Sequence, residues 1–217
     1  MLRICACAVV IAVLGLTKVE LARGADWPHW RGPFRNGHTD ELSNWDGGEW
    51  LPETPDWERR VGKGASSPLV FRDQVYVIGW SNENDTLSCL SLRSGEVEWE
   101  RSYPCPSHGR FHLGEEPIYG GPSATPEIDT ATGLLYSLSI DGDLKCWDLN
   151  KEGQPVWSHN LYEKYQVKQR PKLTKRYHRD YGYTASPLVF KDWVIVEVGA
   201  TDHGTYIAFD KHTGEEQ

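Results

Sequence analysis

The stretch SSPLVFRDQVYVIG, residues 66–79, returns near the end of the chain as ASPLVFKDWVIVEVG, residues 185–199. Between them, SATPEIDTATGLLYSLS, residues 123–139, repeats the order of a hydroxyl residue, a proline and an apolar run. The prolines that mark these starts recur 58 and 61 residues apart: Pro68, Pro126 and Pro187. A long period of this kind indicates a repeat architecture, in which each repeat is one structural unit.

Each repeat predicts four short strands. A proline begins the first strand, where no ladder hydrogen bond is lost, and a β-branched and aromatic run follows. A third strand ends at a glycine turn, and a fourth carries a tryptophan, Trp99 or Trp157, each 31 residues after its proline. Antiparallel four-stranded units at a long period predict an all-β fold, a β-propeller with about three blades present. A two-layer β-sandwich is the alternative, but it would not require the same proline-to-tryptophan spacing twice.

The predicted partial propeller covers residues 57–217, with blades at about 64–103, 121–160 and 182–217. Trp57 precedes the first blade, where the last strand of a preceding blade would lie, so residues 57–62 are expected to form a closing strand. The third repeat would place its tryptophan one position beyond Gln217. We therefore expect the sequence to be an N-terminal part of a ring of about seven or eight blades.

A short motif surrounds each glycine turn. It consists of a small residue, a polar residue two positions later and the glycine: Cys89, Ser91 and Gly95; Cys146, Asp148 and Gly153; Ala208, Asp210 and Gly214. The small residue leaves room for the large tryptophan ring, while the aspartate can hydrogen-bond the backbone that glycine allows to turn sharply. The two cysteines are therefore expected to be small buried residues without a redox role.

This motif resembles the tryptophan-docking repeat of the pyrroloquinoline quinone (PQQ) β-propeller superfamily, the quinoprotein alcohol dehydrogenase-like group. DWPHWRGPFRNG, residues 26–37, is similar to the opening of many secreted bacterial members. The superfamily contains PQQ-dependent alcohol dehydrogenases and the scaffold lipoprotein of the outer-membrane barrel-assembly machine. The resemblance implies PQQ with Ca²⁺, held by oxygen ligands and flat apolar walls, if the protein is an enzyme.

Nothing in the sequence assigns a catalytic or cofactor-binding residue. The adjacent cysteine pair of the family's enzymes is absent, and no position matches their calcium ligand or catalytic aspartate. We therefore favour a binding or scaffold module with an unknown protein or carbohydrate ligand. The alternatives are the N-terminal part of a PQQ-dependent alcohol or polyol dehydrogenase and a barrel-assembly scaffold-like protein, the latter weakened because no lipid-attachment cysteine follows the leader.

The first 25 residues read as a secretory signal peptide, with Arg3, a short apolar run and a small-residue exit at Gly24 or Ala25. The apolar run is too short for a confident membrane span, so we expect a secreted or periplasmic protein without an integral span after cleavage. The chain from residue 26 carries 20 basic and 30 acidic side chains. That net charge of −10 disfavours nucleic acid as a partner. Residues 26–56 are expected to form an aromatic strap that docks on the propeller.

Several weaker candidates lie in the segments between blades. His108 and His112 are four apart, but the surrounding prolines and glycines predict a loop with solvated histidines. The acidic pair Glu115 and Glu116 is likewise read as a surface feature. The basic, tyrosine-containing segment 163–180 could recruit an anionic partner, although a solvated connection is the simpler interpretation.

Overall fold

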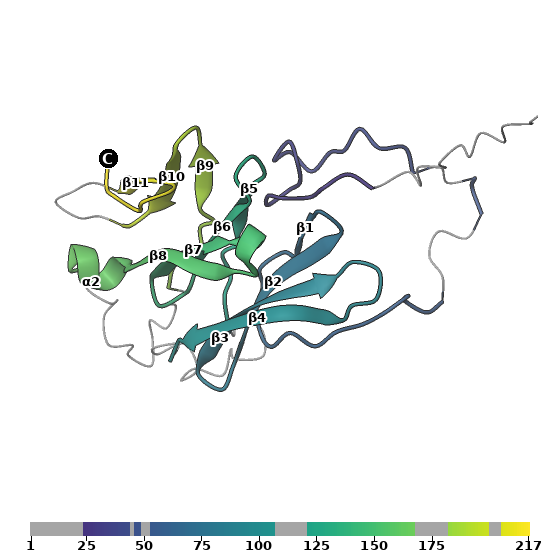
Figure 1. Ribbon diagram of the computed structural model, residues 1–217, viewed down its shortest axis with the longest axis horizontal. Coiled ribbons are helices and arrows are strands. Elements are labelled where there is room, and N and C mark those ends of the chain that lie inside the picture. Colours follow the sequence, from purple (N-terminus) through teal and green to yellow (C-terminus); the bar gives the residue numbers. More distant parts are fainter. Residues whose placement is uncertain (1–23, 44–45, 49–52, 107–120, 168–181, 200–204) are drawn as a thin grey trace, which may run out of the picture.

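The computed structural model describes residues 24–43, 46–48, 53–106, 121–167, 182–199 and 205–217 (Figure 1). Residues 1–23 of the expected signal peptide lie outside this part of the chain. So do His108, His112, Glu115, Glu116 and most of the basic segment 163–180. No helix in the described residues is long and apolar enough to cross a membrane.

Three antiparallel sheets follow one another along the chain, and in each the strands are ordered as in the sequence. The first sheet contains β1 Leu69–Phe71, β2 Gln74–Ser81, β3 Asn84–Ser91 and β4 Val97–Pro104. The second contains β5 Glu127–Asp129, β6 Leu134–Leu138, β7 Asp143–Asp148 and β8 Gln154–Asn160. The third contains β9 Leu188–Phe190, β10 Trp193–Glu197 and β11 Tyr206–Asp210. The predicted all-β propeller architecture is confirmed, and the three sheets are hereafter called blades 1, 2 and 3.

Tight turns keep consecutive strands paired. Arg72 and Asp73 between β1 and β2, and Asn82 and Glu83 between β2 and β3, all have positive φ angles. Turns with positive φ at both central residues twist in the direction that antiparallel strands favour. The short connections therefore produce simple hairpins and fix the pairing of neighbouring strands.

Blades 1 and 2 share one cross-strand row. In blade 1, Cys89 pairs with Tyr76 on one side and with Trp99 on the other. In blade 2, Cys146 pairs in the same way with Tyr136 and Trp157. A register shift follows the cysteine in both blades, so the repeat extends to the β-bulge that positions the tryptophan.

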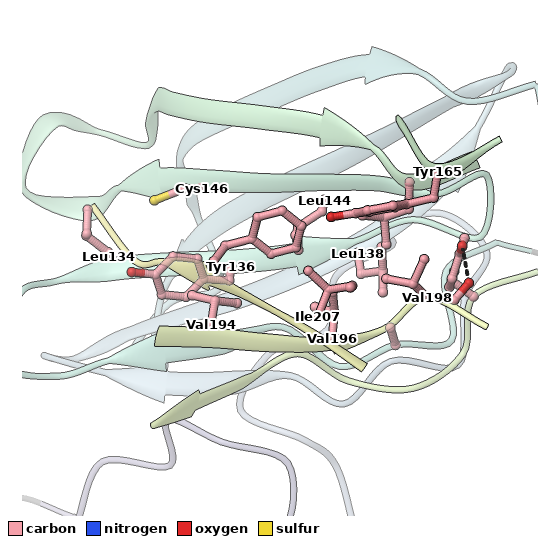
Figure 2. Packing of buried hydrophobic residues seen from close by; sticks show 14 residues of the cluster. Leu134, Tyr136, Leu138, Leu144, Cys146, Tyr165, Val194, Val196, Val198 and Ile207 are labelled. Carbon is pink, nitrogen blue, oxygen red and sulfur yellow. Dashed lines mark hydrogen bonds between the residues drawn. The ribbon is translucent and has the colours of Figure 1, made fainter. Parts of the chain in front are cut away.

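The apolar core lies between the blades. Leu69, Phe71 and Leu87 of blade 1 form one cluster with Leu135 and Trp147 of blade 2. A second cluster joins blades 2 and 3. Figure 2 shows Tyr136 and Leu144 of blade 2 close to Val194, Val196 and Ile207 of blade 3. Each such side chain contributes about 1.5–3 kcal/mol when it is fully buried, so packing between neighbours stabilises each blade.

Two short helical segments, one between β7 and β8 and one after β8, were not predicted. A 3-10 turn, η1 Leu149–Lys151, accommodates the extra residue of the second glycine turn. The helix α2 Leu161–Tyr165 follows β8, and the Asn160 side chain caps it by accepting a hydrogen bond from the Glu163 amide. α2 buries Leu161 and Tyr165, so the start of segment 163–180 is packed onto the blade.

Candidate functional site

The tryptophans of the repeat dock on the glycine turns of the next blade. A Cβ placed on Gly153 of blade 2 would lie 2.4 Å from the Trp99 ring of blade 1, and one on Gly214 of blade 3 would lie 2.7 Å from Trp157. All three turn glycines have positive φ. Only glycine combines this backbone conformation with so close an approach, so the rings and turns form the joints between blades.

Trp57 occupies the same position for blade 1. Its ring lies 2.4 Å from the place a Cβ would take on Gly95, and its indole Nε1 donates to the Leu92 carbonyl at 2.9 Å. Trp157 donates to the Lys211 carbonyl at 3.0 Å in the matching way. Residues 57–62 lie outside the described strands, and their role as a closing strand stays a prediction.

The polar residues of the turn bind backbone amides. The Asp210 carboxylate accepts hydrogen bonds from the amides of Thr213 and His212 at 2.8 Å, and these bonds lower its pKa. Asp148 accepts from the Asn150 amide at 3.0 Å. Cys89 and Cys146 are buried free thiols, and burial raises the pKa of each to about 12. Their thiolates are therefore scarce at neutral pH, which leaves them unsuited to nucleophilic chemistry.

The prolines stand immediately before the first strand of each blade, and a hydroxyl residue precedes each of them. The Ser67 amide donates to Thr125 Oγ1 at 3.0 Å, and the Thr125 amide donates to Ser186 Oγ at 3.0 Å. This chain of hydrogen bonds links the starts of β1, β5 and β9, and β5 also contacts β9. The first strands consequently form the inner edge of the fan of blades (Figure 1).

Of the predicted strap over residues 26–56, residues 26–37 lie on this inner edge, and only this shorter segment is hereafter called the strap. Trp27 forms a two-bond antiparallel bridge with Val70 of β1: its amide donates to the Val70 carbonyl at 2.7 Å, and the Val70 amide donates back at 3.0 Å. The Ile128 amide of β5 donates to the Pro28 carbonyl at 3.1 Å. The strap thereby joins the inner strands of blades 1 and 2.

Glu127 of β5 anchors the strap by charge. Its side chain is buried, forms an ion pair with Arg35 and lies 3.2 Å from Nδ1 of His29. The same carboxylate accepts a hydrogen bond from the Val189 amide of β9 at 3.2 Å. One side chain therefore connects the strap with blades 2 and 3.

Sequence reasoning missed this anchor. Glu127 occupies the position that is leucine in the other two repeats, Leu69 and Leu188. A charged residue at a buried strand position is rare unless it is paired. That mismatch within an apolar repeat was the signal that could have identified it.

The strap carries two exposed aromatic rings, and one of them lies beside a cation. Trp30 is 54% exposed and Phe34 is 55% exposed. The Arg31 guanidinium lies 5.7 Å from the centre of the Trp30 ring and also donates to the Asn36 carbonyl at 3.2 Å. Large aromatic and arginine side chains are enriched where proteins bind partners. This patch, Trp30, Arg31 and Phe34, is the candidate binding site.

The inner-edge carboxylates do not fit the role of calcium ligands beneath PQQ. Glu127 is bound to Arg35 and the Val189 amide, as described above, and Asp129 Oδ2 lies 2.9 Å from Nζ of Lys211 in blade 3. Both carboxylates are thus neutralised by this chain's own groups. Across the described residues, no group of three or more His, Cys, Asp or Glu side chains is arranged to hold a metal ion.

No family model matches the sequence, and no curated relative matches it. Among solved structures, the chain is similar to a europium-containing methanol dehydrogenase, with 20% identity and a TM-score of 0.45 over 72% of this chain and 24% of that one. It is also similar to the quinohemoprotein alcohol dehydrogenase from Comamonas testosteroni, with 24% identity and a TM-score of 0.46 over 72% of this chain and 20% of that one.

BamB from Moraxella catarrhalis is a third similar structure, with 20% identity and a TM-score of 0.38 over 74% of this chain and 50% of that one. This chain therefore spans about a quarter or less of the two dehydrogenases and half of BamB. Consecutive antiparallel blades, joined by tryptophans that dock on the glycine turns of the next blade, show that the described chain has a β-propeller fold.

Proposed function

We propose that this protein is a secreted or periplasmic binding module, and that the strap patch is its recognition surface for a protein partner. The observation that carries the proposal is the exposure of Trp30 and Phe34 on a segment that is itself held firmly on the blades. Backbone bonds to Val70 and Ile128 and the ion pair with Glu127 limit the freedom of the strap. A surface held in this way loses less conformational entropy when a partner binds.

A protein partner suits the patch better than a carbohydrate. One indole ring, one phenyl ring and one guanidinium offer a mainly apolar contact with a single cation, the kind of cluster that dominates binding energy at protein interfaces. The overall negative charge of the chain favours basic partners at long range. The Arg31 cation would then contact a carboxylate or carbonyl at the centre of such an interface.

The test is quantitative co-purification from the envelope of the source cells, followed by an affinity measurement on the purified pair. Trp30→Ala combined with Phe34→Ala should weaken binding of the recovered partner at least tenfold. Leu42→Ala is the matched control, because Leu42 is also exposed and lies outside the strap. If the double variant bound the same proteins with unchanged affinity, the patch would not be the recognition surface. A response to soluble oligosaccharides alone would assign a carbohydrate ligand instead.

A further inference from the structure

The joint between blades 1 and 2 contains a buried aspartate that the repeat does not require. Asp85 lies near the start of β3, where it pairs with Trp80 of β2 and Tyr103 of β4. Counted back from the cysteine of the shared row, the corresponding residue of blade 2 is Gly142. Asp85 is fully buried. A buried carboxyl group is rare unless it is paired, so the repeat alone does not account for this one.

The hydrogen bonds of Asp85 do not compensate for a buried negative charge. Tyr103 donates to Oδ2 of Asp85 at 3.3 Å, whereas Oδ1 has no hydrogen-bond partner among the described residues. A buried carboxylate that lacks donors is costly, because the ionised group loses its hydration and gains little in return. The geometry therefore favours the protonated carboxyl while blades 1 and 2 are in contact.

Two more carboxyl groups face Asp85 from blade 2. Asp141, in the turn before β7, accepts a hydrogen bond from the Cys105 thiol at 3.5 Å, and the same thiol lies close to Asp85. Asp143 is the first residue of β7 and accepts from Ser139 Oγ at 3.4 Å. Burial, together with the charges of Asp141 and Asp143, raises the pKa of Asp85 to about 7. These side chains, Asp85, Cys105, Asp141 and Asp143, are hereafter called the carboxyl cluster.

Two lysines stand near the carboxyl cluster, each over an aromatic ring. Lys145 Nζ lies 4.6 Å from the centre of the Tyr103 ring. Burial raises the pKa of Asp143, and the charge of Lys145 opposes that effect. Lys63 Nζ lies 5.9 Å from the centre of the Trp80 ring. The pKa of Asp85 is raised with these cations in place, so they offset only part of the cost of its ionisation.

The opposite end of the same joint is held by an aromatic ring. There Trp99 docks on Gly153, in the turn after β7, and Cys89 pairs with Trp99. The carboxyl cluster and this aromatic contact thus lie at opposite ends of β7. Contact between the indole ring and the glycine does not depend on a proton. Blades 1 and 2 can therefore separate at the carboxyl end while the aromatic end stays in contact.

From these observations we propose that the carboxyl cluster is a pH-controlled latch: it holds blades 1 and 2 together while Asp85 carries a proton, and it allows this end of the joint to open when Asp85 ionises. The proton passes to solvent, and the carboxylate becomes hydrated. Because opening releases one proton, the equilibrium constant for opening should rise by up to tenfold per pH unit below pH 7 and level off above it. This proposal is independent of the strap patch and of its partner.

Alkylation of the protein's own thiols with iodoacetamide tests the proposal on the full-length protein purified from its source cells. Cys105 lies at the latch, Cys89 lies at the aromatic end of the same joint, and both thiols are buried. Each rate is divided by the rate for the urea-unfolded protein at the same pH, which removes the ordinary pH dependence of a thiol. The corrected rate of Cys105 should be at least tenfold higher than that of Cys89 at pH 8. It should rise roughly fiftyfold from pH 5 to pH 7 and only about twofold from pH 7 to pH 8.

Two variants of the latch sharpen the test. Asp85→Asn keeps the shape of the side chain and removes its ionisation, so the corrected rate of Cys105 should change less than threefold between pH 5 and pH 8. Asp143→Asn removes one of the facing charges that raise the pKa of Asp85, so the rise in rate should level off at a lower pH. Asp40→Asn, at an exposed position, is the control and should behave as the wild type does.

Two results would overturn the proposal. Equal corrected rates for Cys105 and Cys89 at every pH would mean that both thiols react only when the whole chain unfolds. A rise in the Cys105 rate that persists in Asp85→Asn would mean that another group controls the opening. If Asp85→Asn did not fold, Asp143→Asn would decide, because a rate that levels off at the same pH as in the wild type would contradict the latch.

Discussion

Single glycines determine how closely successive blades approach. Gly153 has a φ of +66°, and any Cβ there would overlap the Trp99 ring. Gly153→Ala should therefore incur two costs, about 1–2 kcal/mol for the left-handed backbone and roughly 1–3 kcal/mol for overpacking against the indole. We expect the free energy of unfolding, measured with urea, to fall by about 2–5 kcal/mol.

The matched control for this prediction is Gly47→Ala. Gly47 also has a positive φ, +88°, but no atom lies within 4 Å of the position its Cβ would take. Gly47→Ala should therefore lower the free energy of unfolding only by the cost of the left-handed backbone. Equal losses of stability in the two variants would mean that contact between Trp99 and the turn contributes nothing.

Asp85 makes stability depend on pH. The residue is fully buried between blades 1 and 2, and burial raises the pKa of its carboxyl from 3.8 to about 7, with the nearby charges of Asp141 and Asp143 adding to the effect. Tyr103 donates to Asp85 Oδ2 at 3.3 Å, and the Cys105 thiol lies close by. In the unfolded chain this carboxyl ionises at lower pH, so the folded state binds more protons between pH 3.8 and 7. Stability should fall across that window and level off above it.

Asp85→Asn removes the ionisation and should be more stabilising at pH 8 than at pH 5. The shift corresponds to a penalty on the order of 4 kcal/mol above pH 7, of which about 3 kcal/mol develops between pH 5 and pH 8. Urea unfolding of the wild type and the variant at pH 5 and at pH 8 measures this difference in the free energy of unfolding. Asp40→Asn, at an exposed position, serves as the control and should show no such difference. An identical gain for Asp85→Asn at both pH values would show that Asp85 is already ionised in the fold.

At the scale of elements, the proline-to-tryptophan spacing was enough to predict the blades, because it records the length of four strands and their turns. Burial of Glu127 and Asp129 was not predictable from it, since both depend on cations that approach from the strap and from blade 3. The helix α2 was missed because five residues are too few to produce a helical pattern in the sequence. Local repetition thus predicts elements, while contacts between distant segments need the structure.

The hydrogen bonds that hold the strap on the blades should open more often when the ion pair between Arg35 and Glu127 is removed. Arg35→Gln takes away the cation that pairs with buried Glu127, and loss of one charged hydrogen bond costs about 1.5–3 kcal/mol. Hydrogen exchange of the Trp27 and Ile128 amides, which bond across the strap, should accelerate roughly tenfold to a hundredfold. Arg31→Gln is the control, because the described contacts of Arg31 stay within the strap. Exchange that is equally fast in both variants would rule out Glu127 as the anchor.

For the molecule as a whole, the blades depend on their neighbours for stability. Blade 1 buries apolar side chains against blade 2, and blade 2 buries apolar side chains against blade 3. The packing between neighbours therefore stabilises each blade. Among the residues that the structure describes, blade 3 receives this support on one side only. Leu188, Phe190, Trp193 and Tyr206 of blade 3 form a row of exposed apolar and aromatic side chains on short strands, and exposed apolar surface of this kind promotes association.

Residues 26–217 produced alone should therefore self-associate through blade 3. Phe190→Ser combined with Tyr206→Ser should reduce light scattering during refolding severalfold, because both changes fall within the exposed row. Trp30→Ser combined with Phe34→Ser is a matched control: it removes two aromatic rings of similar exposure from the strap and should leave scattering nearly unchanged. If the strap variant reduced scattering as much as the blade 3 variant, general surface hydrophobicity would be the cause. A selective effect of the blade 3 variant would locate the association on the exposed row of blade 3.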